Sequence, residues 1–253
     1  MDSSFSLEGK RILVTGAASG MGRAFAVLAA ADGAALGLLD VNAEGLAETR
    51  GLLDGGARSE SFPTDLSEWG QVEAAVKGTV DALGGLDVAV NVAGWDQPGR
   101  FWEQPLELWQ RLIAVNLWSV LHVCRAVVPL FLEQEHGRIV MTASDAGRVG
   151  SKGETVYATA KGGIMALTKS LAREVAPHVT VNCLCPGPTR TPLYEQEAVD
   201  NPKLMERLER AIPLRRIAEP EDQARALAFL ASDASAYMTG QVLSVSGGLT
   251  MVG

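Results

Sequence analysis

Short apolar runs alternate with alanine-rich stretches of helical period along the chain, and this alternation restricts the fold more than any other feature. The first run, Arg11–Thr15, is followed by a helical stretch over Gly20–Asp32. Leu86–Val92 is apolar on both faces, as a strand covered by helices on both sides must be. Such strand–helix alternation predicts a doubly wound, mainly parallel sheet of the α/β class.

The complete pattern defines the expected elements. The expected strands are Arg11–Thr15, Ala34–Asp40, Arg58–Pro63, Leu86–Val92, Arg138–Thr142, Val179–Leu184 and Gln241–Val245. The expected helices are Gly20–Asp32, Ala43–Asp54, Glu68–Leu83, Glu107–Leu132, Glu154–Ala176 and Lys203–Arg210. No linker or repeat divides them, so we expect a single-domain Rossmann-type doubly wound sheet over residues 1–253, with about seven parallel strands and helices on both faces. The Pro-rich stretch Pro186–Pro202 is expected to be mobile.

Charge and cysteine usage narrow the range of partners. Asp and Glu total 30 against 22 Lys and Arg, a formal net charge of −8, so the chain lacks the basic surface that nucleic-acid binding needs. Met1–Arg11 has no apolar core typical of a signal peptide, and apolar stretches such as Val127–Leu132 are far shorter than a bilayer span. The 3 cysteines contain no CxxC pair and the 3 histidines show no ligand spacing. We therefore expect a cytoplasmic protein with no nucleic-acid partner, membrane segment or metal.

A glycine-rich loop lies between the first expected strand and the first expected helix. Gly16, Gly20 and Gly22 let the backbone turn sharply, and the helix that follows presents free N–H groups to a negative charge. The spacing, G-x-x-x-G-x-G, is not the commonest dinucleotide fingerprint, and the alternative interpretation is a tight turn without a ligand. The position at a strand-to-helix junction favours a pyrophosphate site.

A carboxylate ends the second strand and discriminates between cofactors. Asp40 can accept hydrogen bonds from the adenosine ribose hydroxyls, and its charge would repel a 2′-phosphate. Ser19 provides no cation in the glycine loop to neutralise such a phosphate, so the sequence favours NAD over NADP. The alternative is that Asp40 only caps the next helix. Asp65 has the same two interpretations, an adenine contact or a cap for the helix near Glu68.

A tyrosine and a lysine one helical turn apart carry the expected chemistry. Tyr157 and Lys161 flank the apolar stripe of the Glu154–Ala176 helix, so their polar ends can converge. A cation about 4 Å from a phenol, at an effective dielectric near 20, is worth about 4 kcal/mol, or roughly three pKa units. That effect would make a phenolate accessible near neutral pH. The alternative is an ordinary half-exposed helical pair.

Two further polar residues support a site at the same edge of the sheet. Ser144 directly follows the fifth strand, at the end where such sheets bind ligands, and its hydroxyl could orient a substrate oxygen. Asn116 lies beside the apolar stripe of the Glu107–Leu132 helix. A buried amide there needs partners, so it either holds a kink or positions a water that relays protons.

Together these segments resemble the short-chain dehydrogenase/reductase family. The resemblance rests on Thr15–Gly22, Asp40, Asn91–Gly94, Asn116, Ser144, Tyr157-Ala-Thr-Ala-Lys161 and Pro186-Gly187, in the family's order, and covers about Leu7 to Gly248. It implies a catalytic set of Asn116, Ser144, Tyr157 and Lys161. It also implies NAD contacts at Gly16, Ser19, Gly20, Met21, Gly22, Asp40, Asp65, Leu66, Asn91, Ala93, Gly94, Tyr157, Lys161, Pro186, Gly187, Thr189 and Thr191.

Family members use the segment at about 187–212 as a substrate lid, and related enzymes are homotetramers. A homo-oligomer is also favoured by the apolar stripes of the two longest helices, which exceed what one sheet face needs.

The segments Gly94–Asp96, Ala143–Ser151, Cys185–Pro188 and Thr239–Met251 carry a narrower resemblance. They resemble the 2-hydroxycyclohexanecarboxyl-CoA dehydrogenases, which oxidise an alicyclic secondary alcohol carried on coenzyme A. Trp95 directly follows the Asn91–Gly94 motif, so we expect its indole to form an apolar wall of the substrate pocket. Asp145, Arg148 and Arg190 are further candidate substrate contacts. The two arginines could contact an anionic group of the substrate, and the alternative is that each is a surface charge.

We therefore expect an NAD-dependent dehydrogenase that interconverts a small secondary alcohol and a ketone. One alternative is an NADP-linked 3-oxoacyl reductase, which would prefer a cation near Ser19 or after Asp40, where Val41-Asn42 stand. A second is a non-catalytic dinucleotide-binding sensor, which needs no Ser-Tyr-Lys set. A third is a Rossmann-fold methyltransferase, in which Tyr157 and Lys161 have no function.

Overall fold

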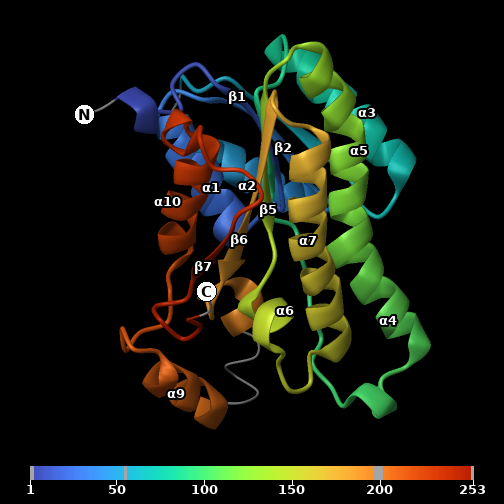
Figure 1. The fold of residues 1–253 in the computed structure, drawn as a ribbon, viewed down its shortest axis with the longest axis vertical. Helices are drawn as coiled ribbons and strands as arrows, with labels where there is room; N and C mark the ends of the chain where they lie inside the picture. Colours follow the sequence, from blue (N-terminus) through green and yellow to red (C-terminus); the bar gives the residue numbers. More distant parts are fainter. Residues whose placement is uncertain (1–2, 54–55, 196–201, 252–253) are drawn as a thin grey trace.

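The computed structural model describes residues 3–53, 56–195 and 202–251, and its centre is one sheet of seven strands (Figure 1). The order across the sheet is β3-β2-β1-β4-β5-β6-β7, and every neighbouring pair is parallel. The strands are β1 (Arg11–Thr15), β2 (Ala35–Asp40), β3 (Ser59–Pro63), β4 (Val88–Asn91), β5 (Gly137–Thr142), β6 (Val179–Pro186) and β7 (Val242–Val245). The predicted seven-stranded parallel sheet is confirmed.

Helices cover both faces of the sheet (Figure 1). One face of the sheet is covered by α1 (Gly20–Ala31), α2 (Ala43–Leu52) and α10 (Pro220–Ala231). The opposite face carries α3 (Trp69–Leu83), α4 (Leu106–Ile113), the π-helical turn η3 (Ala114–Trp118), α5 (Ser119–Glu133) and α7 (Thr155–Glu174). The shorter elements are η1 (Ser3–Phe5), η2 (Phe101–Glu103), α6 (Asp145–Val149), α9 (Pro202–Ala211) and η4 (Asp233–Ser235).

Two helices, α6 and α10, were not expected from the periodicity. The α10 helix does carry a local start signal, because Glu219 and Asp222 form a reciprocal capping box around Pro220. Its buried residues, including Ala224 and Leu227, pack against α1. The capping residues, rather than a wide apolar stripe, were the feature in the sequence that marked this helix.

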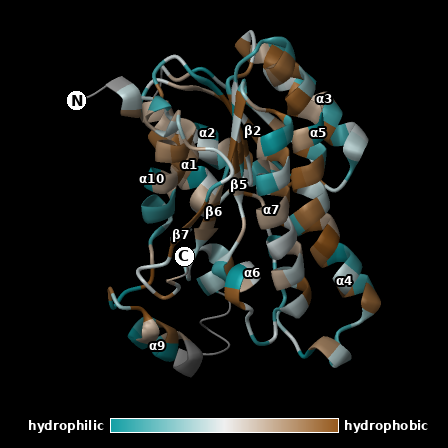
Figure 2. Cartoon of the chain, viewed as in Figure 1, coloured by the Kyte–Doolittle hydropathy of each residue, from teal (hydrophilic) through white to brown (hydrophobic). Residues whose placement is uncertain are grey.

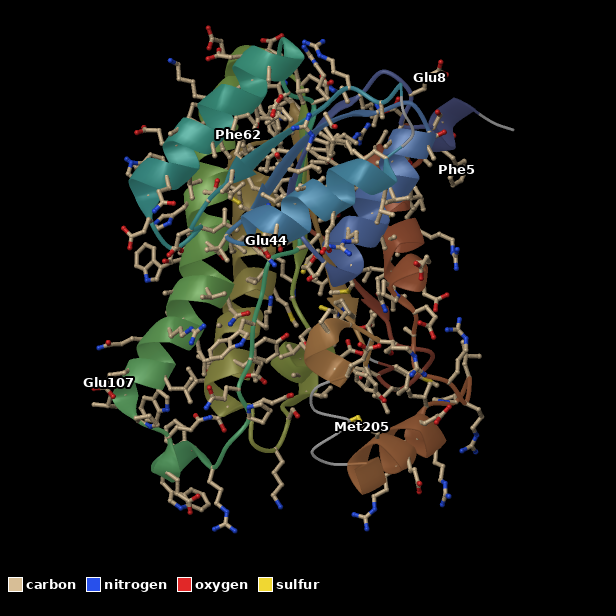
Figure 3. All side chains as sticks on the ribbon, turned by 180° about the vertical axis from the view of Figure 1, so that it is seen from behind. Phe5, Glu8, Glu44, Phe62, Glu107 and Met205 are labelled. Atoms are coloured by element: carbon tan, nitrogen blue, oxygen red, sulfur yellow. The ribbon has the colours of Figure 1, made fainter. Side chains whose placement is uncertain are left out.

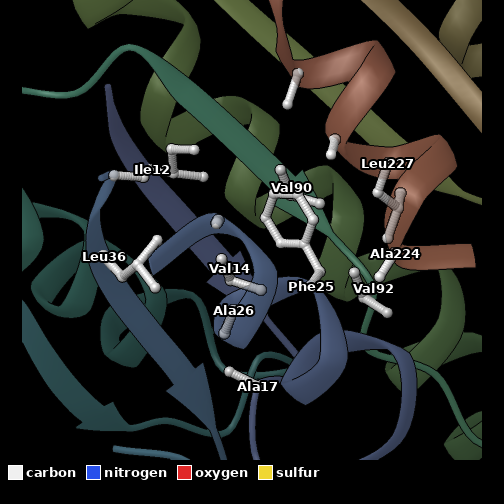
Figure 4. Packing of buried hydrophobic residues seen from close by; sticks show 14 of the residues in the cluster. Ile12, Val14, Ala17, Phe25, Ala26, Leu36, Val90, Val92, Ala224 and Leu227 are labelled. Atoms are coloured by element: carbon white, nitrogen blue, oxygen red, sulfur yellow. The ribbon is translucent and has the colours of Figure 1, made fainter. Parts of the chain in front are cut away.

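Alternate residues along each strand enter two separate hydrophobic clusters. Ile12 and Val14 of β1 pack under α1 and α10, while Leu13 between them packs under α3 and α5. Phe25 of α1 lies at the centre of the first cluster, beside Val90 (Figure 4). Figure 2 shows hydrophobic colour on the central strands and also on helices such as α4 and α5. Burial on both faces explains why these strands are apolar without interruption.

The stretch Leu106–Glu133 forms one continuous helical rod of 28 residues, with mean hydropathy 1.6 in its most apolar window. By length and composition this helix could cross a membrane, a test that core helices also pass. Its apolar runs remain short, because Arg111, Asn116 and Arg125 interrupt them. Val123, Val127 and Phe131 are buried in the cluster beneath α3 and α5. These contacts account for the apolarity of the helix by packing against the sheet and its neighbours.

The sheet order reverses its direction of growth between β1 and β4, and ligands of doubly wound folds bind outside the carboxyl ends of strands at such a point. In Figure 3, Glu107 of α4 and Met205 of α9 lie on opposite sides of this end of the molecule, with Glu44 of α2 above them. The carboxyl ends of β1, β4 and β5 open into the space between these elements.

The first cluster provides a stability test. Phe25 is fully buried, so Phe25→Ala removes its packing and leaves a cavity, and we expect the free energy of unfolding to fall by about 3–5 kcal/mol. Leu52→Ala serves as the control because Leu52 is 57% exposed, and it should change the free energy of unfolding by less than about 0.5 kcal/mol. Urea unfolding followed by circular dichroism measures both. Equal losses in the two variants would contradict the packing described.

Candidate active site

A cavity of about 800 Å³ opens at the carboxyl ends of β1, β4 and β5. This volume suits a ligand of cofactor size. Its wall contains most of the residues predicted from the sequence: Gly16, Ser19, Gly20, Met21, Gly22, Asp40, Asp65, Leu66, Ala93, Gly94, Trp95, Ser144, Tyr157, Lys161, Pro186 and Thr191. The fold thus brings together residues that are up to 175 positions apart, from Gly16 to Thr191.

The glycine loop is shaped so closely to its surroundings that side chains would not fit. Gly16 has a φ of +68°, and a Cβ on it would lie 2.8 Å from the Ala93 backbone. A Cβ on Gly22 would lie 2.1 Å from the Gly16 carbonyl oxygen. Helix α1 begins at this loop with Ser19 as N-cap and no side-chain cap, so its first N–H groups are available to an anion. These features fit a dinucleotide pyrophosphate.

Asp40 occupies the position expected for ribose recognition, and it does not cap α2. Asn42 is the N-cap, because its side chain accepts from Gly45 N at 3.0 Å. The Asp40 carboxylate accepts instead from Ala18 N at 3.2 Å and Asn42 N at 3.0 Å. Each carboxylate oxygen therefore retains the capacity to accept a further hydrogen bond, and Asp40 lines the cavity. The capping alternative for Asp40 is excluded by this arrangement.

Asp65 turns the chain after β3 rather than capping α3. Its Oδ1 accepts from Ser67 N at 2.9 Å and Ser67 Oγ at 2.6 Å. The N-cap of α3 is Glu68, without a side-chain capping bond. Asp65 and Leu66 both line the cavity beside Asp40, where an adenine ring would fit.

Tyr157 and Lys161 converge as their spacing predicted. The Lys161 Nζ lies 5.6 Å from the centre of the Tyr157 ring and donates to the Thr142 carbonyl at 3.1 Å. Lys161 is almost completely buried, with 2% of its surface exposed. An ammonium so far from bulk water is held by the ring face and by the carbonyl oxygen.

The electrostatics of this pair differ from the simple expectation. Burial raises the pKa of the Tyr157 phenol above its ordinary value, while the hydrogen bond with Ser144 lowers it and the negative charges of Asp96 and Glu154 raise it further. Burial also lowers the pKa of Lys161 to about 8. The sequence predicted a fall of roughly three units in the phenol pKa, because that prediction considered only the attraction between the phenolate and the Lys161 ammonium. In the structure, the loss of hydration of the phenolate outweighs this attraction, and the pKa of Tyr157 is raised instead.

Ser144 is positioned by the helix it begins. It is the N-cap of α6, and its Oγ accepts from Ala146 N at 3.1 Å. The same hydroxyl is hydrogen-bonded to the phenol of Tyr157. A substrate oxygen bound beside Tyr157 would meet both hydroxyl groups.

Asn116 is held by backbone partners on two sides. It lies in the π-helical turn between α4 and α5, a local irregularity often found at functional sites. Its Oδ1 accepts from Trp95 N at 3.1 Å, and its Nδ2 donates to Trp95 O at 2.7 Å and Leu112 O at 2.9 Å. Asn116 therefore clamps the β4 loop behind the cavity and does not itself belong to the cavity wall.

Three of the four proposed substrate contacts bind other parts of the protein. Asp145 Oδ1 accepts from Ser244 Oγ at 2.7 Å. Arg148 donates to the Val242 carbonyl at 2.7 Å, and Arg190 pairs with Glu219 at 3.1 Å. None of the three lines the cavity, which leaves Trp95 as the predicted substrate residue within it.

Three predicted cofactor residues, Asn91, Gly187 and Thr189, also lie outside the wall. Asn91 is buried at the end of β4, and Thr189 donates to the Gly187 carbonyl at 2.9 Å. Of the expected lid at 187–212, residues 191–193 line the cavity, whereas residues 196–201 lie outside the described part of the structure.

Several cavity residues were not predicted. Thr142 follows from its place at the end of β5, but Glu107, Gln110 and Arg111 of α4 carry no local motif. Asp96 is 7% exposed and contributes a negative charge to both Tyr157 and Lys161. Among the described residues, no group of His, Cys, Asp and Glu could hold a metal ion, and the cysteines are free and buried.

The fold and the site define a nucleotide-binding oxidoreductase architecture, and sequence comparisons identify its family. A family model described as Enoyl-(Acyl carrier protein) reductase matches residues 16–250. Oxidoreductase UcpA of Salmonella typhimurium is 39% identical over 97% of this chain and 96% of its own length. The 3-oxoacyl-(acyl-carrier-protein) reductase FabG of Thermotoga maritima is 37% identical over 97% and 99%. The chain belongs to the short-chain dehydrogenase/reductase family, whose members bind a nicotinamide dinucleotide.

A solved structure agrees with this assignment. A 7α-hydroxysteroid dehydrogenase complexed with NADH and 7-oxo glycochenodeoxycholic acid superposes with a TM-score of 0.91. The two sequences are 28% identical, and the match covers 98% of this chain and 97% of the other. The protein is thus an oxidoreductase of this family that acts on a small molecule.

The negative charge of Asp96 can be tested through the pH dependence of turnover. A carboxylate stabilises both the neutral phenol and the ammonium, so Asp96→Asn lowers the pKa of Tyr157 and of Lys161. We expect the profile of kcat/KM against pH to move to lower pH as a whole.

The matched control is Asp145→Asn, which removes an equally buried carboxylate that acts on neither group. This variant should leave the profile in place. An unchanged profile in Asp96→Asn, or the same displacement in both variants, would show that Asp96 does not set these pKa values.

Proposed function

We propose that this protein is an NAD-dependent dehydrogenase that interconverts a secondary alcohol and a ketone. The observation that carries the proposal is the meeting of Ser144, Tyr157 and Lys161 in the same cavity as the glycine loop. A non-catalytic sensor would need the glycine loop and Asp40 but not a buried lysine against a phenol. A methyltransferase would likewise leave this pair without a function.

NAD is favoured over NADP by the charges at the adenosine end of the cavity. The Asp40 carboxylate faces the cavity, held by Ala18 N and Asn42 N. Val41 and Ser19 bring no positive charge to this end of the cavity. A 2′-phosphate would meet this carboxylate, and none of the described residues that line this end of the cavity is a cation.

Each polar group has a distinct part in the reaction. Tyr157 takes the proton of the substrate hydroxyl, and Ser144 holds the same oxygen by a hydrogen bond. Lys161 keeps a positive charge next to the phenol and stabilises its deprotonated form. Asn116 fixes Trp95 and the adjoining backbone behind the site. When bound, the nicotinamide accepts or supplies the hydride, and its positive oxidised form favours the phenolate.

The cavity wall supports a ring-shaped or aliphatic alcohol. Trp95 contributes an indole beside the catalytic groups, and Val92, Ala143 and Leu193 add apolar surface. An alicyclic alcohol, free or carried as a hydroxyacyl-CoA thioester, is the substrate class that we propose. The narrower resemblance to 2-hydroxycyclohexanecarboxyl-CoA dehydrogenases supports this class.

A second candidate is the reduction of a 3-oxoacyl thioester with NADP. It is favoured by the relatives that bear the name 3-oxoacyl-(acyl-carrier-protein) reductase. The carboxylate of Asp40 argues against the phosphorylated cofactor. Turnover of the two substrate classes with each dinucleotide separates the candidates.

We further propose a homotetramer in the cytoplasm, with the 187–212 segment closing over bound substrate. The outer side of the Leu106–Glu133 rod supports association, because Trp118 and Leu132 remain 52% and 40% exposed there. Large apolar side chains on one helix face are typical of a face that is covered in an assembly.

The proposed base is tested by Tyr157→Phe. This variant keeps the ring that packs beside Lys161 but removes the hydroxyl that takes the proton. We expect calorimetric binding of NAD to remain within about twofold, while kcat falls by about 10²–10⁴, the usual contribution of a general base. Turnover close to that of the wild type would remove Tyr157 from the mechanism.

Cofactor choice is tested by Asp40→Ala. Loss of the carboxylate removes hydrogen bonds to the ribose and the repulsion of a 2′-phosphate, so we expect weaker NAD binding and a measurable gain in NADP binding. Each charge-assisted bond of this kind is worth about 1.5–3 kcal/mol, or roughly a tenfold to hundredfold change in Kd. A wild type that prefers NADP would contradict the proposal.

A further inference from the structure

Arg111 is a cation in the cavity wall that the reaction chemistry leaves unused. It lies on α4 and reaches the cavity together with Glu107 and Gln110 of the same helix. Its side chain is exposed. Among the described residues, its side chain interacts with Trp95 and not with the glycine loop or the Ser144-Tyr157-Lys161 group.

The guanidinium of Arg111 is held by stacking rather than by a carboxylate. It lies over the Trp95 ring, 4.1 Å from the ring centre, and Trp95 is itself fixed through its backbone by Asn116. Within residues 3–53, 56–195 and 202–251, the Arg111 side chain makes no ion pair and no hydrogen bond. Stacking leaves the edge of the guanidinium, with its N–H donors, available to a ligand.

The other arginines near the site contrast with Arg111. Arg148 is occupied by the Val242 carbonyl, and Arg190 is occupied by Glu219 outside the cavity. Besides Lys161, Arg111 is the one basic residue among the described residues that line the cavity, and its side chain makes no ion pair with a described carboxylate. Arginine recognises carboxylate and phosphate groups by paired hydrogen bonds.

We propose that Arg111, oriented on Trp95, binds an anionic group of the alcohol substrate, either a carboxylate or a phosphate of a carrier such as coenzyme A. This inference rests on the proposed dehydrogenase function and assigns its substrate class as anionic. Trp95 then has two roles: its ring forms apolar wall and its face positions the cation. Arg111 thereby determines specificity without contacting the reacting carbon.

The test compares matched alcohols that differ in charge. The probes are 2-hydroxycyclohexanecarboxylate, its methyl ester and its coenzyme A thioester, each oxidised with NAD by the wild type and Arg111→Gln. We expect Arg111→Gln to raise KM for one or both anionic alcohols by about tenfold with little change in kcat. KM for the methyl ester and for NAD should stay the same.

The two anionic probes distinguish the source of the charge. A rise in KM for the free carboxylate assigns Arg111 to a carboxylate, whereas a rise for the thioester alone assigns it to the phosphates of coenzyme A. Arg111→Lys keeps the charge without the planar fork, so it should recover only part of the affinity. An equal rise for the methyl ester, a rise confined to NAD, or no rise at all overturns the proposal.

Arg125→Gln is a matched control from the same helical rod. The Arg125 guanidinium lies over the Trp69 ring at 5.2 Å, but it faces a separate groove between α3 and α5. This variant also loses a stacked arginine, and it should leave every KM unchanged. A KM rise in Arg125→Gln equal to that in Arg111→Gln would show a general effect on the helix and overturn the proposal.

A binding measurement separates this inference from the proposed function. Calorimetry with cyclohexanecarboxylate and cyclohexanecarboxyl-CoA, which cannot be oxidised at a hydroxyl, reports affinity without turnover. If the wild type does not oxidise the alcohols, the proposed function is overturned. About tenfold weaker binding of the probes to Arg111→Gln than to the wild type would still support the anion site. Equal binding in the two proteins, or no binding of either probe to the wild type, would overturn it.

Discussion

The buried ammonium of Lys161 is the constraint on which the rest of the site depends. A charge with 2% exposure is costly unless polar groups replace the lost water. The Thr142 carbonyl at 3.1 Å and the face of Tyr157 provide part of this compensation. The negative charge of Asp96 acts in the same direction. With its pKa near 8, Lys161 stays protonated at neutral pH and keeps a positive charge beside the phenol.

This arrangement relates the chemistry to the fold. The Thr142 carbonyl is available because β5 ends there, and Lys161 reaches it from α7 across the carboxyl edge of the sheet. Gly94 must remain small at the same place, since a Cβ on it would lie 3.1 Å from Lys161 Nζ and 3.1 Å from Asn116 Oδ1. The end of β5, Gly94 and Lys161 therefore pack together as one unit. The hydrophobic core fixes the backbone of this unit, and the backbone in turn fixes the positions of the polar groups of the site.

The sequence predicted much of this unit because its signals are local. Strand ends, glycine spacing and the four-residue step from Tyr157 to Lys161 are all written in short segments. The direction of the Tyr157 pKa was not predicted, because the energetic cost of burying a phenolate depends on the whole surrounding wall. Arg111 was missed for a related reason. Its availability as a cation depends on stacking with Trp95, 16 residues earlier, and on the lack of an ion pair with any described carboxylate, although Glu107 lies one helical turn away in the same wall.

Asp40 shows that structural and functional roles need not be alternatives. Its carboxylate accepts one backbone N–H from the glycine loop and one from the turn before α2, so it holds together the two segments that form the adenosine end of the cavity. These bonds orient the carboxylate and leave each of its oxygens able to accept a further hydrogen bond at the cavity that Asp40 lines. A residue that only capped a helix would point its oxygens along the helix axis instead. The bonds that brace Asp40 are thus what make it a preformed acceptor for a ribose, and recognition follows from the same geometry that stabilises the loop.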